Sequence, residues 1–371
     1  MLSFHPLEVT SVERIAEDAV CMTLDVPPAL RAEFQHDAGQ YVTVRRMIDG
    51  REERRTYSIV TAPGGAWLRL GVREQQGGRM SRELATRLRP GDRLDVGTPV
   101  GRFRTAVDPA RSRCYVAFAA GSGITPVLSL ATDILAREPK SRFTLIYGNR
   151  SMARSMFLEE ILALKNRHLE RFSVHFVMSR EPQQTAWLNG RIDAAKVAEL
   201  ARHIGDVAAA DEYFVCGPGR MVDEVREAIK LVNPAAPVRL ERFAAAVAGG
   251  AGAAVPANAA ALHTNGSAAA AAAPVHELLS TISVIMDGRR RSFSMTVEDA
   301  SVLEAAERAG LDLPFSCRSG ICATCRARIV GGAASMAHNI ALEGWEIDLG
   351  FVLCCQARPT TPQLELSYDE K

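Results

Sequence analysis

The sequence predicts a multi-domain chain that combines an antiparallel β-barrel, a parallel α/β domain and a third, smaller domain. Residues 1–104 contain short strand patterns separated by turns, which is typical of a small antiparallel barrel. In residues 105–243 buried strands alternate with helical patterns, which favours a parallel sheet covered by helices. Residues 244–275 contain no Asp, Glu, Lys or Arg. We expect them to form a flexible Ala/Gly-rich linker to the third domain, residues 276–371.

Length and charge exclude several classes of protein. The chain has 371 residues and a net charge of +1 at pH 7, so nothing indicates binding to nucleic acid. No apolar run is long enough to span a membrane, and the first residues lack the pattern of a signal peptide, so we expect a cytoplasmic protein without membrane insertion. Residues 276–371 carry nine basic against thirteen acidic side chains, whereas the rest of the chain is mildly basic. An acidic domain favours a basic partner, although ordinary solubility would explain the same charge.

The predicted barrel consists of five apolar or alternating segments separated by Pro- and Gly-containing turns. These segments are Leu7–Ile15, Cys21–Val26, Gln40–Arg46, Arg55–Val60 and Trp67–Val72. A helical pattern through Leu84 and Leu88 follows the last of them. The number of strands and their spacing are those expected of a small antiparallel barrel.

Two motifs in the barrel have the chemistry of a nucleotide site. Arg55-Thr56-Tyr57-Ser58 opens a predicted strand, where the guanidinium can hold a phosphate through two hydrogen bonds. The ring of Tyr57 points to the same side of the strand as Arg55 and can lie against a flat ring. Gly77-Gly78-Arg79-Met80-Ser81 leads into a helix, and such a start with a serine hydroxyl suits a pyrophosphate. Either motif alone also arises by chance, and Tyr57 could equally be an ordinary barrel residue.

The α/β segment has two glycine-rich turns at the carboxyl ends of predicted strands, where ligands of parallel sheets bind. Gly121-Ser122-Gly123-Ile124-Thr125-Pro126 follows the strand Cys114–Ala120, and Cys216-Gly217-Pro218-Gly219 follows the strand Glu212–Val215. The first turn lacks the third glycine of the usual dinucleotide motif. A dinucleotide site and a plain strand–helix turn are therefore both open for it. The remaining predicted elements are the strands Phe143–Tyr147 and Arg171–Val177, and helices ending at Arg137, over Met156–Lys165 and over 220–231.

The third domain is predicted as a small mixed sheet crossed by one helix. A capping box at Ser301-Val302-Leu303-Glu304 begins this helix, and Gly310 ends it. The predicted strands are Thr281–Met286, Arg291–Thr296, Ala327–Val330, Phe351–Cys355 and Leu364–Ser367. A loop rich in cysteine lies between the helix and the third of these strands.

Four cysteines in this domain predict a metal cluster. Cys317, Cys322 and Cys325 have C-x4-C-x2-C spacing, and Cys355 follows after 29 further residues, which is the pattern of plant-type [2Fe–2S] proteins. Thiolates are the soft ligands that iron–sulfur clusters require. Zinc is the weaker alternative because its four-cysteine sites usually contain two C-x2-C pairs, and disulfides would need an oxidising compartment.

The motifs, in this order, resemble those of the ferredoxin–NADP reductase superfamily followed by a plant-type ferredoxin, which implies a β-grasp fold for the last domain. The reductase-like motifs are Arg55–Ser58, Gly78–Ser81, Gly121–Pro126 and Cys216–Gly219. The ferredoxin-like motifs are Pro314–Arg328 and Gly350–Cys355. The domain order, together with Tyr147–Ser151 and Glu241–Phe243, is most similar to that of phenylacetyl-CoA epoxygenase reductases. Reductases of steroid and alkane hydroxylases share this layout, although the linker here is longer than we expect for the epoxygenase group.

The resemblance implies three cofactors and assigns residues to each. The implied FAD ligands are Arg55, Thr56, Tyr57, Ser58, Gly78 and Ser81. The implied dinucleotide ligands are Gly121, Gly123, Thr125, Arg150, Ser151, Arg154, Cys216 and Gly217. The residues implied beside the reacting atoms are Tyr57, Ser58, Cys216, Glu241 and Phe243, with Tyr57 and Phe243 on opposite faces of the flavin. The implied cluster ligands are Cys317, Cys322, Cys325 and Cys355. Because the resemblance aligns Cys355 with the fourth ligand, it implies that Cys354 is a buried spare thiol.

The preferred dinucleotide is predicted from the residues that follow the second strand of the α/β segment. Arg150, Ser151 and Arg154 lie where the 2′-phosphate of NADPH would fall. Two cations and a hydroxyl favour NADPH over NADH, which usually pairs with an acidic residue at this place. NADH stays the alternative because exposed arginines are common.

The three cofactors together predict an electron-transfer reaction. A nicotinamide gives two electrons at once and a [2Fe–2S] cluster takes one, so a flavin must stand between them. We therefore expect electrons to pass from NADPH through FAD and the cluster to a separate oxygenase component, of aromatic or CoA-thioester degradation. The alternative is an NADH-dependent reductase of a steroid, alkane or Rieske-type hydroxylase. The intact motifs disfavour a passive carrier, and the chain has no length left for an oxygenase domain of its own.

Overall fold

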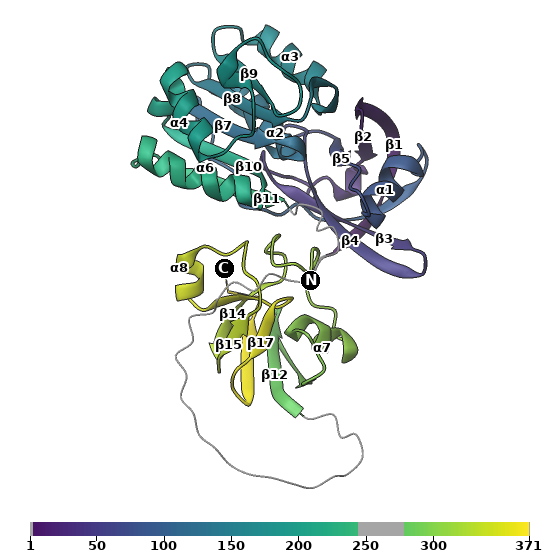
Figure 1. The fold of residues 1–371 in the computed structure, drawn as a ribbon. Coiled ribbons are helices and arrows are strands. Elements are labelled where there is room, and N and C mark those ends of the chain that lie inside the picture. Colours follow the sequence, from purple (N-terminus) through teal and green to yellow (C-terminus); the bar gives the residue numbers. More distant parts are fainter. Residues whose placement is uncertain (1–2, 244–277, 371) are drawn as a thin grey trace. The chain divides into compact units, whose positions relative to one another are not determined.

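The computed structural model describes residues 3–243 and 278–370. They belong to two compact units, and each unit is described by itself. In Figure 1 the first unit is coloured from purple through teal, and the second from green to yellow. The predicted linker at residues 244–275 lies outside the described residues.

The first unit begins with a six-stranded antiparallel barrel. Its strands are β1 (Phe4–Ala16), β2 (Ala19–Asp25), β3 (Tyr41–Ile48), β4 (Arg51–Ser58), β5 (Trp67–Arg73) and β6 (Arg93–Gly97). They pair in the order β4-β3-β6-β1-β2-β5, and an antiparallel bridge between Ile59 and Leu70 joins the two ends of this order. Alternate residues such as Leu68 and Leu70 point into the barrel core. The helix α1 (Arg79–Thr86) adds Leu84 to the same core.

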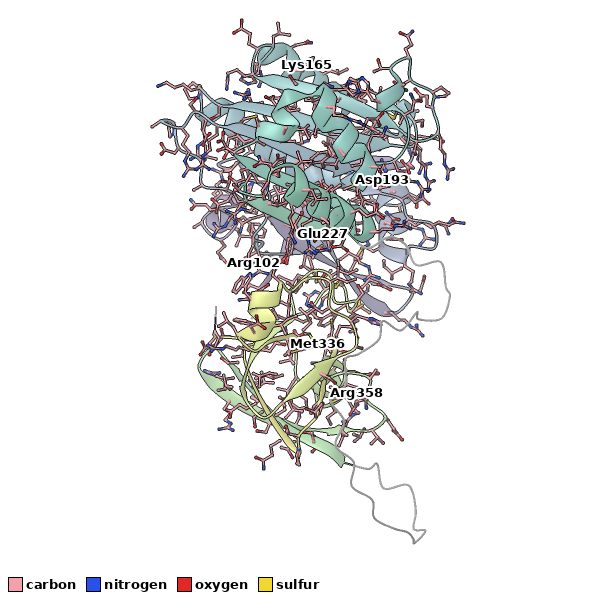
Figure 2. All side chains as sticks on the ribbon, turned by 60° about the vertical axis from the view of Figure 1, so that its left-hand side comes forward. Arg102, Lys165, Asp193, Glu227, Met336 and Arg358 are labelled. Atoms are coloured by element: carbon pink, nitrogen blue, oxygen red, sulfur yellow. The ribbon has the colours of Figure 1, made fainter. Side chains whose placement is uncertain are left out.

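A parallel α/β domain completes the first unit. Its strands are β7 (Cys114–Ala120), β8 (Arg142–Asn149), β9 (Phe172–Met178), β10 (Glu212–Pro218) and β11 (Val238–Phe243), in the order β11-β10-β7-β8-β9. Its helices are α2 (Ile124–Arg137), α3 (Leu158–Arg167), α4 (Ala194–His203), α5 (Gly205–Ala209) and α6 (Gly219–Val232). Apolar residues of α2 and α3 pack on one face of the sheet, and those of α4, α5 and α6 pack on the other. Figure 2 marks Lys165 on α3, Asp193 at the start of α4 and Glu227 on α6.

The barrel and the α/β domain share one core. Ala19 and Cys21 of β2 belong to the same buried cluster as the apolar residues of α2 and α3. At the junction, a Cβ added to Gly71 of β5 would lie 2.8 Å from the methyl group of Thr125 and 2.8 Å from the ring of Phe157. The absence of a side chain at this position therefore lets the barrel approach the beginning of α2 closely.

The second unit is a small mixed sheet with one main helix. Its strands are β12 (Leu278–Met286), β13 (Arg289–Thr296), β14 (Arg326–Gly331), β15 (Ala334–Met336), β16 (Phe351–Leu353), β17 (Ala357–Pro359) and β18 (Gln363–Ser367). Five of them pair in the order β13-β12-β18-β14-β16, and β15 pairs with β17. The helix α7 (Val302–Arg308) begins as predicted, because the hydroxyl of Ser301 accepts a hydrogen bond from the N–H of Glu304. A second helix, α8 (Gly344–Asp348), precedes β16.

The predicted fold class is confirmed, while several weakly patterned elements were not predicted. The strand β6 has only five residues, and the edge strand β11 has no buried residue. The helix α4 buries only Val197 and Leu200. Short or exposed elements carry too few apolar residues to give a clear period.

Candidate electron-transfer site

The loop that carries three of the four cysteines is held in an unusual backbone conformation. Arg318, Gly320 and Ala323 all have positive φ, between 55° and 74°. A Cβ at Gly320 would lie 2.8 Å from the carbonyl oxygen of His338, so this position requires glycine. The carbonyl of Gly320 accepts hydrogen bonds of 3.0 Å from the N–H groups of Ile340 and Ala341. Left-handed residues that cluster in this way often mark a functional loop.

The four cysteines form two close pairs. The thiol of Cys322 lies beside Cys317, and that of Cys325 lies beside Cys355. The hydrogen bond from Cys322, supported by the N–H groups of residues 319 and 321, lowers the pKa of Cys317 to about 4. The hydrogen bond from Cys325 likewise lowers the pKa of Cys355. The partner thiols, Cys322 and Cys325, have pKa values raised by the same pairing and by burial. Each pair therefore favours one thiolate, which is the form that binds metal.

This arrangement fits a binuclear cluster. Two pairs of thiols are the donor set of a [2Fe–2S] cluster, in which each iron takes two protein ligands. Cys354 is fully buried and its thiol lies beside the phenol of Tyr368. The assignment of Cys355 rather than Cys354 as the fourth ligand stays a prediction, supported by the pairing of Cys355 with Cys325.

The barrel and the α/β domain bring three of the predicted reactive residues together. The Sγ atom of Cys216 on β10 lies 3.8 Å from Oε2 of Glu241 on the neighbouring strand β11. The carboxyl of Glu241 also has a hydrogen bond with Ser58, at the end of β4. Burial raises the pKa of Glu241 to about 8, although both hydrogen bonds oppose the rise. This environment therefore favours the protonated form of the Glu241 carboxyl group.

The other residues assigned to the flavin lie along β4 and at the end of β11. Tyr57 is partly buried against the barrel core, and burial raises its pKa despite the nearby charge of Arg55. The guanidinium of Arg55 is half exposed and lies 2.9 Å from Glu53. Thr56 pairs with Thr43 of β3, whose buried hydroxyl has no hydrogen-bond partner among the described residues. At the end of the sheet, Phe243 packs against the core that contains Cys216.

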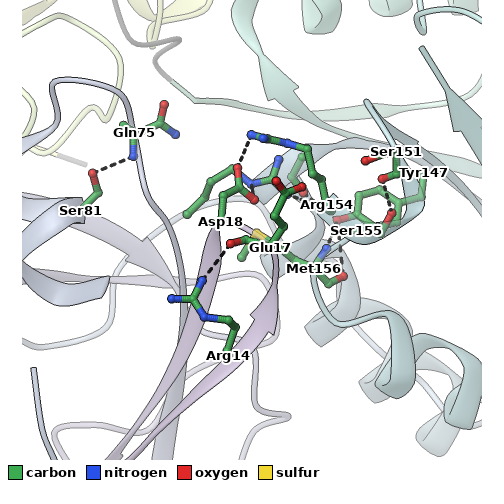
Figure 3. A network of polar contacts seen from close by, with 12 residues as sticks. Arg14, Glu17, Asp18, Gln75, Ser81, Tyr147, Ser151, Arg154, Ser155 and Met156 are labelled. Carbon is green, nitrogen blue, oxygen red and sulfur yellow. Dashed lines mark hydrogen bonds and ion pairs between the residues drawn. The ribbon is translucent and has the colours of Figure 1, made fainter. Parts of the chain in front are cut away.

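The glycine that precedes α1 is shaped for close approach. A Cβ at Gly78 would lie 2.5 Å from the Oγ atom of Ser81, so only glycine leaves this hydroxyl in place. The hydroxyl accepts a hydrogen bond of 3.0 Å from the N–H of Gln75, as Figure 3 shows. Its proton is left to donate to a phosphate oxygen. Ser81 and the N–H groups at the beginning of α1 therefore fit a pyrophosphate.

The two glycine-rich turns meet at the carboxyl edge of the parallel sheet. A Cβ at Gly123 would overlap the carbonyl oxygen of Cys216, so the ends of β7 and β10 are in direct contact. Gly121 has a φ of +58°, and a Cβ there would lie 2.9 Å from Nη1 of Arg73. The hydroxyl of Thr125 donates a hydrogen bond of 2.9 Å to the carbonyl oxygen of residue 122. A Cβ at Gly217 would lie 2.9 Å from the terminal methyl group of Met221. These bare turns fit a dinucleotide that lies across the strand ends.

Of the three residues assigned to a 2′-phosphate, Arg154 is held elsewhere. Its guanidinium forms an ion pair with Asp18, in the turn between β1 and β2, and Figure 3 shows this contact. Its carbonyl oxygen accepts a hydrogen bond from Arg73. These contacts give Arg154 a role in fixing the loop after β8 to the barrel, and its contact with a 2′-phosphate stays a prediction. Arg150 is exposed, and Ser151 lies beside it at the start of this loop.

Sequence reasoning missed Asp18, Arg73 and Arg180. The N–H of Arg180, two residues beyond β9, donates to the carbonyl oxygen of Arg150 at 2.9 Å, so two exposed arginines lie together at the sheet edge. The rule that pointed to Arg150, the carboxyl end of a parallel strand, applies equally to the end of β9. Asp18 and Arg73 gave no such signal, because each lies beside a barrel turn, where charged residues are common.

Family models match all three domains in chain order. An oxidoreductase FAD-binding domain matches residues 6–105, an oxidoreductase NAD-binding domain matches 118–227, and a 2Fe-2S iron-sulfur cluster binding domain matches 284–360. The chain therefore contains an FAD domain, a nicotinamide-nucleotide domain and a [2Fe–2S] domain. None of the described helices is long and apolar enough to cross a membrane.

Known proteins match along the whole chain. The chain is 35% identical to one of the subunits of the 1,2-phenylacetyl-CoA epoxidase of Escherichia coli, over 100% of this chain and 99% of that protein. It is 29% identical to the ferredoxin reductase component of 3-ketosteroid-9-alpha-monooxygenase of Mycobacterium tuberculosis, over 100% and 98%. Phthalate dioxygenase reductase shares the fold, with a TM-score of 0.57, 22% identity and 98% of both chains covered.

Proposed function

Because this chain belongs to the family of oxygenase reductase components, in which a ferredoxin–NADP reductase module precedes a plant-type [2Fe–2S] ferredoxin, we propose that it delivers electrons to a separate oxygenase. The electrons come from NADPH and pass through FAD and the cluster. The observation that carries this proposal is that a single chain holds sites for all three groups. The flavin, when bound, accepts a hydride and gives up single electrons.

The residues of the chain supply binding, orientation and a proton. The bare turns at Gly121 and Gly123 would bring the nicotinamide over the end of the sheet, beside Cys216. Glu241 would hold a proton next to Ser58, where the charge of the flavin changes on reduction. The paired thiols would hold the cluster.

NADPH is proposed as the electron donor, and a CoA-thioester oxygenase as the acceptor. The adjacent, exposed Arg150 and Arg180 support the first choice, because guanidinium groups bind a phosphate well. The relative with 35% identity belongs to a phenylacetyl-CoA epoxidase, which supports the second. An NADH-dependent steroid hydroxylase reductase is the second candidate, because a full-length relative with that partner is 29% identical.

Anaerobic mixing of the purified protein with NADPH tests the reductase function. We expect the flavin absorption to bleach first and the reduced cluster to give an electron paramagnetic resonance signal, with subsequent reduction of cytochrome c. A protein that contains flavin and iron but is not reduced by either NADPH or NADH would contradict the proposal. Reduction of oxygenase components encoded beside this gene would then identify the acceptor.

A further inference from the structure

The strand β13 of the second unit begins with three arginines, Arg289, Arg290 and Arg291. The guanidinium of Arg290 forms an ion pair of 3.2 Å with Glu365. Arg289 and Arg291 are exposed, and neither has an ion pair or hydrogen bond with the residues that the structure describes. Because side chains alternate along a strand, these two share one face of the sheet and Arg290 lies on the other. Two unpaired guanidinium groups on one face can bind an anion.

A cavity of about 310 Å³ lies beside these two arginines and has an apolar floor. The side chains of this floor are Val284, Met286, Leu311 and Leu313. Val284 and Met286 stand directly opposite Arg291 and Arg289 in the register of β12 and β13. The volume is at the lower end of the range of ligand pockets, about 300–1,000 Å³. The cavity therefore combines two cations with an apolar surface and has room for a small ligand.

The turn that leads into the arginines is fixed by the end of the chain. Asp287 and Gly288 have φ angles of +53° and +69°, as an Asp-Gly turn of a two-residue hairpin requires. The N–H groups of both residues donate to the carboxylate of Asp369, at 2.7 Å and 2.9 Å. The backbone that carries Arg289 is therefore held in place before any ligand binds, which lowers the entropy cost of binding.

The charge of the cavity selects a monoanion. Asp287 also lines the cavity, so its two guanidinium groups and one carboxylate give the lining a net charge of +1. One carboxylate neutralises this charge, and a guanidinium can hold both of its oxygens. An inorganic phosphate would carry more charge than the lining can neutralise, and it would leave the apolar floor in contact with water. An apolar chain attached to a carboxylate would cover that floor, which is favourable in proportion to the area buried.

We propose that the second unit binds a small monocarboxylate with an apolar chain, held by Arg289, Arg291 and the apolar floor. The carboxylate pairs with the guanidinium groups, and the chain lies on the floor. Leu313 precedes Cys317 by four residues, so their Cα atoms are at most about 14 Å apart. The ligand therefore binds beside the iron–sulfur loop, in a different unit from the dinucleotide turns. Binding here needs no electron donor, so the inference goes beyond the proposed function and does not depend on it.

Calorimetric titration of the full-length protein, loaded with flavin and cluster, tests this site with three probes. Octanoate has one carboxylate and an apolar chain, octanol has a similar chain without the charge, and inorganic phosphate has charge without a chain. We expect octanoate to bind saturably. Octanol and phosphate should bind at least about 10-fold more weakly, because each lacks one of the two interactions.

Two variants of β13 locate the site. Arg289→Gln combined with Arg291→Gln should raise the Kd for octanoate about 10-fold or more, because both charge-assisted contacts are lost. If this double variant loses its cluster absorption, the two substitutions are measured singly. Arg290→Gln is the matched control, since Arg290 lies on the other face and pairs with Glu365, and its Kd should equal that of the wild type. The inference is overturned if octanoate does not bind saturably to the wild type, if phosphate or octanol binds as tightly, or if the control loses as much affinity as the arginine variants.

Discussion

The cluster loop and the flavin–dinucleotide junction are built in opposite ways. Three of the four proposed cluster ligands come from the nine residues Cys317–Cys325, and positive φ angles within this loop set their directions. The junction instead joins Ser58, Cys216 and Glu241, which come from strands of two domains. The first site depends on local backbone geometry, whereas the second depends on how the barrel packs against the parallel sheet. The two sites should therefore fail in different ways when single residues change.

The largest effect is expected when one ligand of the cluster is removed, because the cluster needs all four thiolates. Cys355→Ser should abolish the cluster, because a binuclear site cannot replace a missing thiolate with a buried hydroxyl at equal strength. Visible absorption and iron content measure the loss, while flavin content and reduction of the flavin by NADPH should be unchanged. Cys354→Ser is the matched control, since this fully buried neighbour lies beside Tyr368 instead. The opposite pattern in the two variants would make Cys354 the fourth ligand.

Gly123→Ala should damage the junction alone. The added methyl group would overlap backbone atoms of Cys216 and Gly217, and no side-chain rotation can relieve such a clash. A displacement of about 1 Å at a reacting centre can cost about 100-fold in rate, so NADPH-dependent flavin reduction should fall by at least that factor. Stopped-flow absorption measures it. Gly205→Ala is the control, because a Cβ there has open space. Loss of the cluster in Gly123→Ala would show that the two sites are not independent.

The same contrast explains how much of the molecule could be predicted from sequence. The cluster ligands were found because their spacing is local, and β7 and β8 because they are long apolar strands beside glycine turns. The roles of Asp18 and Arg73 could not be found, because their contacts with Arg154 exist only after the barrel packs on the α/β domain. Asp is a common turn residue, so an Asp in a β-turn has no distinguishing pattern.

Asn149 shows the same limit in another form. The residue stands in the Tyr147–Ser151 motif, and its position at the end of a strand could be predicted. That its side chain is buried beside the phenol of Tyr147 could not, because this property depends on every neighbour in three dimensions. Glu241 is similar: its place in the chain gave no reason to expect a pKa of about 8, which results from burial between β4, β10 and β11.

Glu241→Gln tests this partly buried carboxyl through the pH dependence of stability. Burial raises its pKa from the ordinary 4.5 to about 8, so the folded state favours the protonated form. The contribution of the group to stability is complete below pH 4.5 and is lost as the pH rises towards about 8. Glutamine cannot ionise, so the Tm of the variant relative to wild type should increase between about pH 5 and about pH 8. A difference that does not change with pH would mean that the carboxylate is solvated.

The same variant should slow turnover. If Glu241 supplies a proton beside Ser58, cytochrome c reduction by Glu241→Gln should fall by about 100-fold, the lower end of the range for general acid–base catalysis. Glu224→Gln is the control, because Glu224 lies on the surface of α6 in an ion pair with Arg220. Unchanged turnover in the Glu241 variant would leave the carboxyl with a purely structural role at the junction.

The smallest effect is expected at the edge of the junction, where a single exposed cation is removed. Arg150→Ala should raise the KM for NADPH about 10-fold and leave that for NADH nearly unchanged, because one charge-assisted contact with a 2′-phosphate is worth about 1.4 kcal/mol or more. Arg180, whose backbone is bonded to that of Arg150, would retain part of the phosphate affinity. Arg202→Ala on the exposed side of α4 should change neither KM. Equal increases for both dinucleotides would remove Arg150 from the phosphate site.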